Sequence, residues 1–551
     1  MRHGRRGGAR RSAAEALRSV TAQRDAVAAE GQRERGRLVA RAGVVGAGTL
    51  ASRVLGLARD MTLAALFDRD ATDAWWVAFT IPNALRSLLG EGAIASAVVP
   101  VLSDRLARQG DEAGKRFFAR ARGASFVALA VVTGLGMLLA RPLTELFAAG
   151  YRDRPGELER TVELTRVVFP YIFFMGTAAL GMAALNANRR FAVAAFAPGL
   201  LNVALIAAAF AGPFVSPEDP VRALAVGALA GGLLQVAAQW PALRRIGYAG
   251  RPSFVLDADV REVLRRIAPL TFGIGIYYVD LVLSRRFLSE LGPGAQSYFS
   301  WAMRLCDFPQ GIFVMALSTA ALPSLSTLAA KGAEDELGRT WAHGMGLAMF
   351  VAIPASVAFA VLGEPIVVAL FQRGAFDAMA AHETARALLW QGGSIWTVAA
   401  VRQTVPAFYA LGDTRTPVVV SAIDLCAFVG LALGLRGSMG HVGISIAVAG
   451  SSAVQMALLL VGLRRRIGMI ACGSLARSAA RSLAASLVAG LAGWGAAAGL
   501  APGASAGAAA RAWPGLAASC AFGLAFLIVA RGLRSPELAE VTDAVRRRLA
   551  R

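Results

Sequence analysis

Fourteen apolar segments, each long enough for a helix of about 20 residues, run through the chain between residues 38 and 533. Charged residues are largely confined to the gaps between them. Only 17% of the residues are charged and the mean hydropathy is +0.54, whereas soluble domains have about 25% charged residues. The pattern predicts an all-α integral membrane protein and excludes a soluble or disordered chain. We place the segments at 38–66, 73–103, 123–148, 161–187, 192–214, 221–243, 266–290, 295–327, 342–371, 383–411, 416–435, 442–463, 476–500 and 512–533.

The positively charged residues alternate with these segments. If the N-terminus lies in the cytoplasm, the two tails and the loops after even-numbered segments carry 39 Lys and Arg residues, whereas the loops on the other side carry 10. Basic residues favour cytoplasmic loops. The count predicts 14 transmembrane helices with both termini cytoplasmic. It also attributes most of the net charge of +21 to topology, so no nucleic-acid partner is expected.

An internal repeat at an offset of about 223 residues divides the apolar part of the chain. Six spans separate the two copies, which gives both copies the same orientation in the membrane. We therefore expect two pseudo-symmetric six-helix lobes, related by an axis along the membrane normal, plus two extra C-terminal helices. The matched positions are Pro100–Ser103 with Pro323–Ser326, Trp75-Trp76 with Tyr298-Phe299, and Gly150 with Gly374. The predicted divisions are a basic cytoplasmic tail at 1–37, an N-lobe at 38–243, a cytoplasmic linker at 244–265, a C-lobe at 266–470, spans 13 and 14 at 471–535, and a second basic tail at 536–551.

After the 49 Lys and Arg residues assigned to tails and loops are subtracted from the total of 57, eight arginines remain in the apolar segments, where a guanidinium costs about 2.5–3.5 kcal/mol on insertion scales. Three of them, Arg285, Arg286 and Arg386, lie near segment ends, where a long side chain can extend its charge to the membrane surface. The others are predicted to line a cavity, because they outnumber the nearby acids. The planar fork of arginine matches phosphate oxygens, so the ligand should be a lipid head group or a phosphorylated metabolite. These cavity candidates are Arg53, Arg59, Arg86, Arg304 and Arg402.

Acidic residues accompany these arginines inside the segments. Asp60 is seven residues after Arg53 and shares its helix face, whereas Asp307 is three residues after Arg304 and can pair with it. The candidates for gating or structural pairing are Asp60, Asp73, Glu91 and Asp307. The candidates for a cation site are two acids in spans 7 and 11, Asp280 and Asp424. Four histidines and four cysteines are too scattered for a metal site, and no cofactor is expected.

Catalytic motifs are missing from the sequence. It has no GxSxG motif, Walker A loop, HExxH motif or dinucleotide fingerprint. The prediction is therefore a transporter and not an enzyme. An intramembrane glycosyltransferase and a non-transporting scaffold of the cell-wall machinery remain alternatives, although a scaffold would not need interior arginines. An exporter of drug-like cations would favour acidic residues in its cavity.

Several motifs closely resemble those of the MurJ (MviN) lipid II flippase family. The first is SRVLGLARD at residues 52–60, and the resemblance extends from about residue 38 to about residue 470, and more loosely over the last two spans. Further matches are Ala71–Ala74, Phe79, Ile81–Asn83, Arg86, Glu91–Ala93, Val99-Pro100, Phe169–Tyr171, Leu185-Asn186, Arg190-Phe191, Phe196–Pro198, Leu201-Asn202, Phe308-Pro309, Leu322–Ser326, Phe408–Asp413 and Thr416-Pro417.

The resemblance implies the fold of the multidrug/oligosaccharidyl-lipid/polysaccharide exporter superfamily. It implies that the chain moves lipid II, an undecaprenyl-diphosphate-linked peptidoglycan precursor, to the outer leaflet of the bacterial inner membrane by alternating access. It also implies partners among membrane lipids and the proteins of cell-wall synthesis and division. The cavity arginines would contact the diphosphate and sugars, Arg402 matches a basic position on the tenth helix, and the last two spans would form a lipid-tail groove. Another polyprenyl-diphosphate saccharide remains an alternative substrate.

The chain departs from the family pattern at three places. Met303 stands where members often have an acid, and Ser87 stands at a basic position. Some members bind sodium through acids on the seventh and eleventh helices, whereas Asp280 and Asp424 lie about one turn away from the aligned positions. Sodium coupling, proton coupling and the membrane potential therefore all remain open as the energy source.

Overall fold

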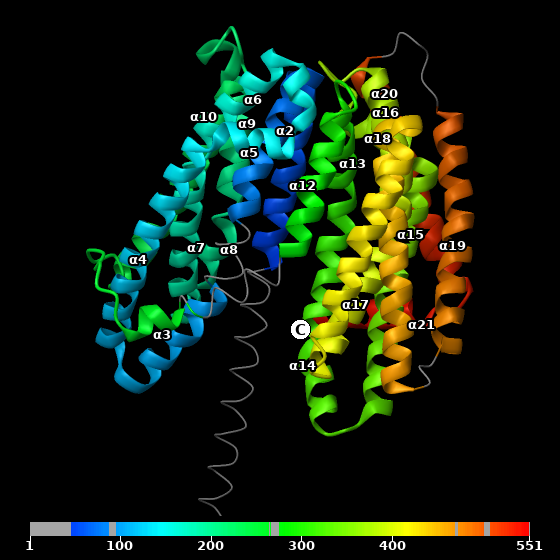
Figure 1. Ribbon diagram of the computed structural model, residues 1–551. Helices are drawn as coiled ribbons and strands as arrows, with labels where there is room; N and C mark the ends of the chain where they lie inside the picture. The colour runs from blue at the N-terminus through cyan, green and yellow to red at the C-terminus, as the bar shows by residue number, and fades with distance from the viewer. Residues whose placement is uncertain are drawn as a thin grey trace, which may run out of the picture.

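The computed structural model describes residues 46–86, 95–263, 265, 275–468, 472–500 and 507–549. These parts of the chain are helical and contain no strand (Figure 1). This confirms the predicted all-α class. A first helix covers 46–66 and is followed by α2 (Arg69–Arg86), α3 (Ala95–Gln109), α4 (Asp111–Leu138), α5 (Ala140–Phe147), η2 (Ala149–Asp153), α6 (Pro155–Val168), α7 (Tyr171–Ala187), α8 (Phe191–Phe196), α9 (Gly199–Val215) and α10 (Arg222–Arg245). The second half contains α12 (Gly275–Ser289), α13 (Ala295–Pro309), η3 (Gln310–Val314), α14 (Met315–Ala330), α15 (Glu334–Phe371), α16 (Ala378–Gly393), α17 (Ile395–Ala410), α18 (Arg415–Ile467), α19 (Cys472–Gly499), α20 (Ala508–Gly532) and α21 (Pro536–Leu549).

Eight helical stretches among the described residues are long and apolar enough to cross a membrane. A π-helical turn divides one of the other predicted spans. The span predicted at 295–327 consists of α13, a π-helical turn (η3) that starts after Pro309, and α14. The eight stretches are Asp111–Leu138, Pro155–Ala187, Phe191–Val215, Arg222–Arg245, Glu334–Phe371, Arg415–Ile467, Gly473–Gly499 and Ala508–Gly532.

The long helix α18 folds back on itself. Gly440 has φ 58° and ψ −137°, a left-handed conformation that glycine adopts without steric cost. The amide of Gln455 donates to the hydroxyl of Ser421 at 3.2 Å, so the two arms run side by side. The arms coincide with the two spans predicted at 416–435 and 442–463.

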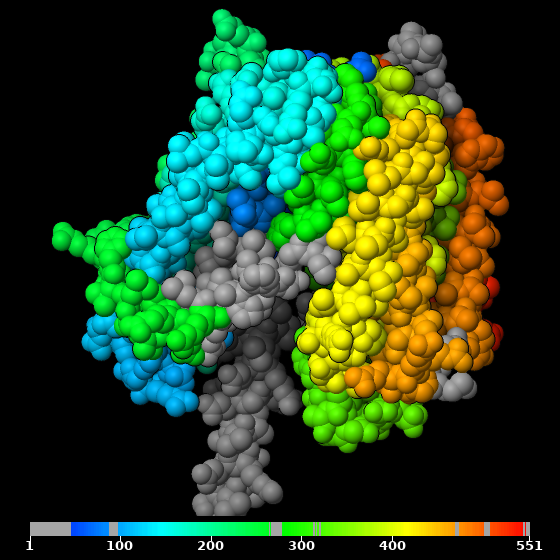
Figure 2. All heavy atoms as spheres, viewed as in Figure 1, coloured from blue at the N-terminus to red at the C-terminus, as the bar shows by residue number. Residues whose placement is uncertain are grey.

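The helices form two groups that meet at one end. We call residues 46–245 the N-bundle and residues 275–467 the C-bundle. At this joined end α2 packs on α13, and α5 and η2 pack on α12. The bundles diverge toward the opposite end, where the α3–α4 and α14–α15 turns lie far apart (Figures 1 and 2). Helices α19, α20 and α21 add a layer outside the C-bundle through contacts with α15.

The start of α4 differs from the sequence prediction. The third span was predicted at 123–148, with the residues before it in a basic loop. Instead, α4 begins at Asp111, so Arg122 lies inside the helix and is only 6% exposed. The count of basic residues assigned Arg122 to the loop, because it follows several other basic residues between 105 and 120.

Candidate functional site

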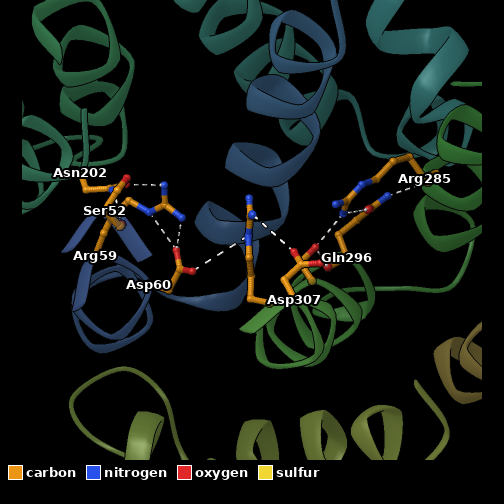
Figure 3. Close-up of polar contacts among 9 residues, drawn as sticks. Ser52, Arg59, Asp60, Asn202, Arg285, Gln296 and Asp307 are labelled. Carbon is orange, nitrogen blue, oxygen red and sulfur yellow. Dashed lines mark hydrogen bonds and ion pairs between the residues drawn. The ribbon is translucent and has the colours of Figure 1, made fainter. Parts of the chain in front are cut away.

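Arg59 and Asp60 form a buried ion pair on the first helix (Figure 3). The guanidinium donates to Asp60 Oδ1 from Nε at 2.8 Å and from Nη2 at 2.6 Å. Its Nη1 donates to Asn202 Oδ1 at 3.0 Å, and the Asn202 amide donates to the carbonyl of Ser52 at 3.0 Å. All three nitrogens of the Arg59 guanidinium thus donate within the N-bundle, and the bond to Asn202 ties the first helix to α9.

Arg304 on α13 brings a positive charge from the C-bundle to this pair. Its Nε lies 4.0 Å from Asp60 Oδ2, and its Nη1 lies 3.8 Å from Asp307 Oδ2. Both distances exceed hydrogen-bond length. The guanidinium also lies over the ring of Trp76, with 5.3 Å between Cζ and the ring centroid. The Arg304 side chain is about one-third exposed, so its N–H groups can donate hydrogen bonds to a ligand.

Arg53 and Arg402 complete the cluster. Arg53 crosses from the first helix to the C-bundle, where its Nη1 donates to the carbonyl oxygen of Asp307 at 3.1 Å; its Nε is buried without a partner. Arg402 on α17 lies close enough to Asp307 to attract its carboxylate. Four guanidinium groups (Arg53, Arg59, Arg304 and Arg402) thus face two carboxylates (Asp60 and Asp307), which leaves an excess of two positive charges.

One further predicted site residue of the N-bundle lies at the end of α2. Arg86 lies at the last residue of α2, where its Nε donates to Asn83 Oδ1 at 2.9 Å. Glu91 belongs to the segment 87–94, which lies outside the described residues.

Arg285 differs from the prediction. It was expected to extend its charge toward the membrane surface, but it is 5% exposed and lies between α12 and α13. Its Nη1 donates to Gln296 Oε1 at 3.0 Å and to Ser300 Oγ at 2.7 Å (Figure 3). Neutral hydrogen-bond partners within the protein therefore stabilise the Arg285 guanidinium, which does not reach the membrane surface. Arg286, in contrast, is half-buried and pairs with Glu290, and Arg386 is exposed and pairs with Glu383.

Asp73 joins the two bundles at their closed end. Its carboxylate accepts hydrogen bonds from the backbone N–H of Gly294 at 2.7 Å, the N–H of Ser297 at 2.8 Å and the hydroxyl of Ser297 at 2.5 Å. These donors lie at the N-terminus of α13, which carries partial positive charge. A buried carboxylate of one bundle therefore caps a helix of the other.

Two reciprocal backbone contacts flank this cap. Gly150 of the N-bundle approaches Ser289, and a Cβ at Gly150 would lie 2.3 Å from the Ser289 carbonyl oxygen. Gly374 of the C-bundle approaches Ala65, and a Cβ there would lie 2.0 Å from the Ala65 carbonyl oxygen. Gly150 and Gly374 are the glycines matched by the internal repeat at an offset of 224. Ala65 and Ser289 are separated by the same offset.

The contacts lie in layers along the helix axes. From the joined end inward, α13 presents Ser297, then Trp301, then Arg304. Trp301 and Trp76 of α2 meet edge to face, with 5.0 Å between ring centroids. This aromatic layer separates the closed end from the arginine cluster. The cluster therefore faces the diverging side of the bundles.

Asp280 and Asp424 lie near one another within the C-bundle. Their carboxylates are close enough to repel each other. One oxygen of Asp424 is buried without a partner. No group of three or more His, Cys, Asp or Glu residues suited to a metal occurs in the parts of the chain that the structure describes.

An apolar pocket of about 650 Å³ lies between the C-bundle and α19. Its walls come from α15, α17, the second arm of α18 and α19. Trp341, Met345 and Trp396 line one side, and Ala479 and Leu483 line the other. Arg464 is the one charged residue among its lining residues. The pocket suits a hydrocarbon chain.

Comparison with known families identifies a similar group of proteins. The family model described as "Lipid II flippase MurJ" matches residues 63–503. A lipid II flippase MurJ of Burkholderia cenocepacia is 34% identical over 435 residues, which cover 76% of this chain and 82% of the relative. A probable lipid II flippase MurJ of Bdellovibrio bacteriovorus is 34% identical over 442 residues, which cover 79% and 83%.

Solved structures share the fold at lower sequence identity. A structure described as a lipid II flippase MurJ in an inward closed conformation has a TM-score of 0.71 at 20% identity and covers 89% of this chain and 99% of its own. An inward-facing multidrug resistance transporter of the MATE family has a TM-score of 0.63 at 15% identity, with 77% and 96% covered. These likenesses support the architecture of two helix bundles.

Proposed function

Because this chain belongs to the lipid II flippase MurJ family, we propose that it moves lipid II from the cytoplasmic to the outer leaflet by alternating access. The observation that carries the proposal is the arginine cluster, which is assembled from both bundles and has an excess of two positive charges. A diphosphate cannot be solvated by hydrocarbon, and guanidinium groups can replace its water. A drug cation would be repelled by the same site.

The contacts suggest a sequence of events. With the joined end closed, the head group enters from the diverging side and meets Arg304, whose present partners lie at 3.8 and 4.0 Å. Binding to arginines of both bundles favours their approach, because the ligand binds the closed arrangement more tightly. The joined end must then open, which breaks the Asp73 cap and the two glycine contacts. The pocket between α15 and α19 would hold the lipid tail.

We further propose fourteen spans in two six-helix lobes, with both termini in the cytoplasm of a bacterial inner membrane. The reciprocal contacts of Gly150 with Ser289 and of Gly374 with Ala65 support the pseudo-symmetry, since both obey one offset. The joined end then faces outward and the diverging end faces the cytoplasm. Association with proteins of cell-wall synthesis and division remains a prediction.

Complementation tests the proposed function. The chain should restore growth to cells depleted of their essential lipid II flippase, and lipid II should again become accessible at the outer leaflet. Growth without restored accessibility would point to another role, such as a scaffold.

The topology predicts opposite accessibility of two exposed valines. In a variant without native cysteines, Val215→Cys should react with an impermeant maleimide added outside intact cells. Val255→Cys should react only after the membrane is opened, because it lies in the basic linker. Reaction of both from the same side would refute the fourteen-span arrangement.

The cation site predicts ion-dependent stability. If Asp280 and Asp424 hold one cation together, sodium or acidification should raise the melting temperature of the wild type, because repulsion between the carboxylates is relieved. Asp280→Asn and Asp424→Asn should each remove this dependence, whereas Asp70→Asn, an exposed control, should retain it. Ion-insensitive melting of the wild type would leave the membrane potential as the driving force.

A further inference from the structure

A buried arginine without an acidic partner among the described residues lies in the N-bundle, outside the arginine cluster between the bundles. Arg122 of α4 is 6% exposed. Its Nη1 donates to the carbonyl of Tyr248 at 3.2 Å, and its Cζ lies 5.7 Å from the ring centroid of Phe118. Its Nε is buried without a hydrogen-bond partner. Among the described residues no carboxylate lies within ion-pair distance of it, although buried charges in proteins are normally paired.

Two glutamines add unsatisfied polar groups to the same region. Gln239 of α10 is 1% exposed and Gln235, one turn earlier, is fully buried. The amide nitrogen and the amide oxygen of both side chains have no hydrogen-bond partner. Native proteins rarely leave such groups unpaired. The unpartnered Nε of Arg122 and the unpartnered amide of Gln239 therefore indicate a ligand that supplies their hydrogen bonds.

Arg122 and Gln239 line one pocket of about 150 Å³. It lies where α4 and α10 both pack against α7, on the side of the N-bundle away from the C-bundle (Figure 1). A pocket of this size is several times larger than a single water requires. Phe126 and Trp240 line it as well, and Trp240 is 46% exposed. The lining is thus mostly apolar and aromatic, and Arg122 and Gln239 add buried polar side chains to it.

The pocket lies near the basic end of its helices. Gln239 precedes Arg245, the last residue of α10, by six residues, or about 9 Å at 1.5 Å per residue. Arg122 follows the exposed Arg116 by the same interval. The nearby acids are already paired, Asp257 with Arg120 and Asp111 with Lys115. This depth corresponds to the interfacial region of a bilayer, where tryptophan is also enriched.

We propose that this pocket binds the phosphate group of an anionic phospholipid of the adjacent leaflet. Arg122 would donate to the phosphate oxygens through its free Nε, and the Gln239 amide would donate beside it. The acyl chains would pass the exposed ring of Trp240. This is a structural lipid site in the N-bundle, separate from the head-group site that contains Arg304.

Thermal shift and native mass spectrometry of the delipidated full-length protein test the proposal. Phosphatidylglycerol should bind as one retained lipid and raise the melting temperature of the wild type, whereas a diacyl glycolipid without phosphate should not. Arg122→Gln should weaken phosphatidylglycerol binding about ten- to a hundredfold, the range for losing a charge-assisted hydrogen bond. Arg116→Gln, which removes an exposed charge from the same helix, should bind it like the wild type.

Gln239→Leu provides a second variant that keeps the arginine. Since it removes an unsatisfied buried amide, it should melt at or above the wild-type temperature without lipid and should still lose affinity for phosphatidylglycerol. A full shift with inorganic phosphate alone would overturn the lipid assignment in favour of a free anion. Wild-type phosphatidylglycerol binding by both pocket variants, or no binding by the wild type, would overturn the site and leave buried water as the partner of Arg122.

Discussion

Replacing Arg304 with alanine should abolish or strongly reduce lipid II transport while the protein still inserts and melts close to the wild-type temperature. Arg304 is partly exposed and its ion pairs are long, so its loss costs little stability, about 0–1 kcal/mol. Loss of a charge-assisted contact with the diphosphate costs about 1.5–3 kcal/mol, which predicts about ten- to a hundredfold weaker head-group binding. Titration of the purified protein with lipid II measures this loss.

Two matched substitutions separate charge from geometry. Arg304→Lys should recover only part of the affinity, because lysine lacks the bidentate fork. Arg386→Ala removes an exposed arginine that pairs with Glu383 outside the cluster and should leave binding intact. Equal affinity of Arg304→Ala and the wild type would contradict a role for this side chain in binding.

Replacement of Arg59 with alanine should have a different effect, because each nitrogen of its guanidinium already donates to Asp60 or Asn202. Arg59→Ala leaves the buried Asp60 with Arg304 alone at 4.0 Å. Breaking a buried pair in this way costs about 3–5 kcal/mol. The sequence predicts that both arginines line the cavity. In the structure Arg59 holds the first helix in place, whereas Arg304 has donors available to a ligand.

Replacing Asp73 with asparagine should open the joined end. Asparagine keeps the shape of the aspartate side chain but lacks the negative charge of the carboxylate, which accepts three hydrogen bonds from the start of α13. Loss of about 1.5–3 kcal/mol would shift the ratio of closed to open molecules about ten- to a hundredfold. Electron–electron distance measurements between spin labels at 153 and 379 would report the joined end, and labels at 108 and 331 would report the diverging end.

The two label pairs should move in opposite directions in Asp73→Asn. The distance at the joined end should lengthen and the distance at the diverging end should shorten, as alternating access requires. Asp70→Asn, an exposed acid one turn earlier on α2, serves as the control and should match the wild type. Unchanged distances in Asp73→Asn would show that the carboxylate does not hold the bundles together.

Much of this arrangement could be predicted from the sequence, because a membrane imposes strong rules. Interior charges are costly, so Arg53, Arg304, Asp60 and Asp307 stood out, and the structure brings them together. The repeat identified Gly150 and Gly374 as equivalent positions. An apolar helix does not encode which neighbour it faces, however. The cap between Asp73 and Ser297, and the contacts of both glycines with the opposite bundle, therefore appear only in the structure.

Buried arginines near helix ends were harder to assign. Arg285 and Arg122 both lie close to predicted segment ends, where exposure to the membrane surface is the default expectation. Arg285 finds Gln296 and Ser300 on a neighbouring helix, whereas Arg122 has no acidic partner among the described residues. A hydropathy profile cannot distinguish these cases, because it contains no information on packing between helices.

Transport by the purified protein tests the central claim most directly. Vesicles that contain the wild type and fluorescent lipid II should make the internal lipid accessible to an impermeant quencher, and vesicles with Arg386→Ala should behave alike. Vesicles that contain the double variant of Arg53→Ala and Arg304→Ala at matched protein content should resemble protein-free vesicles. Wild-type transport by the double variant would contradict a head-group site made by these arginines.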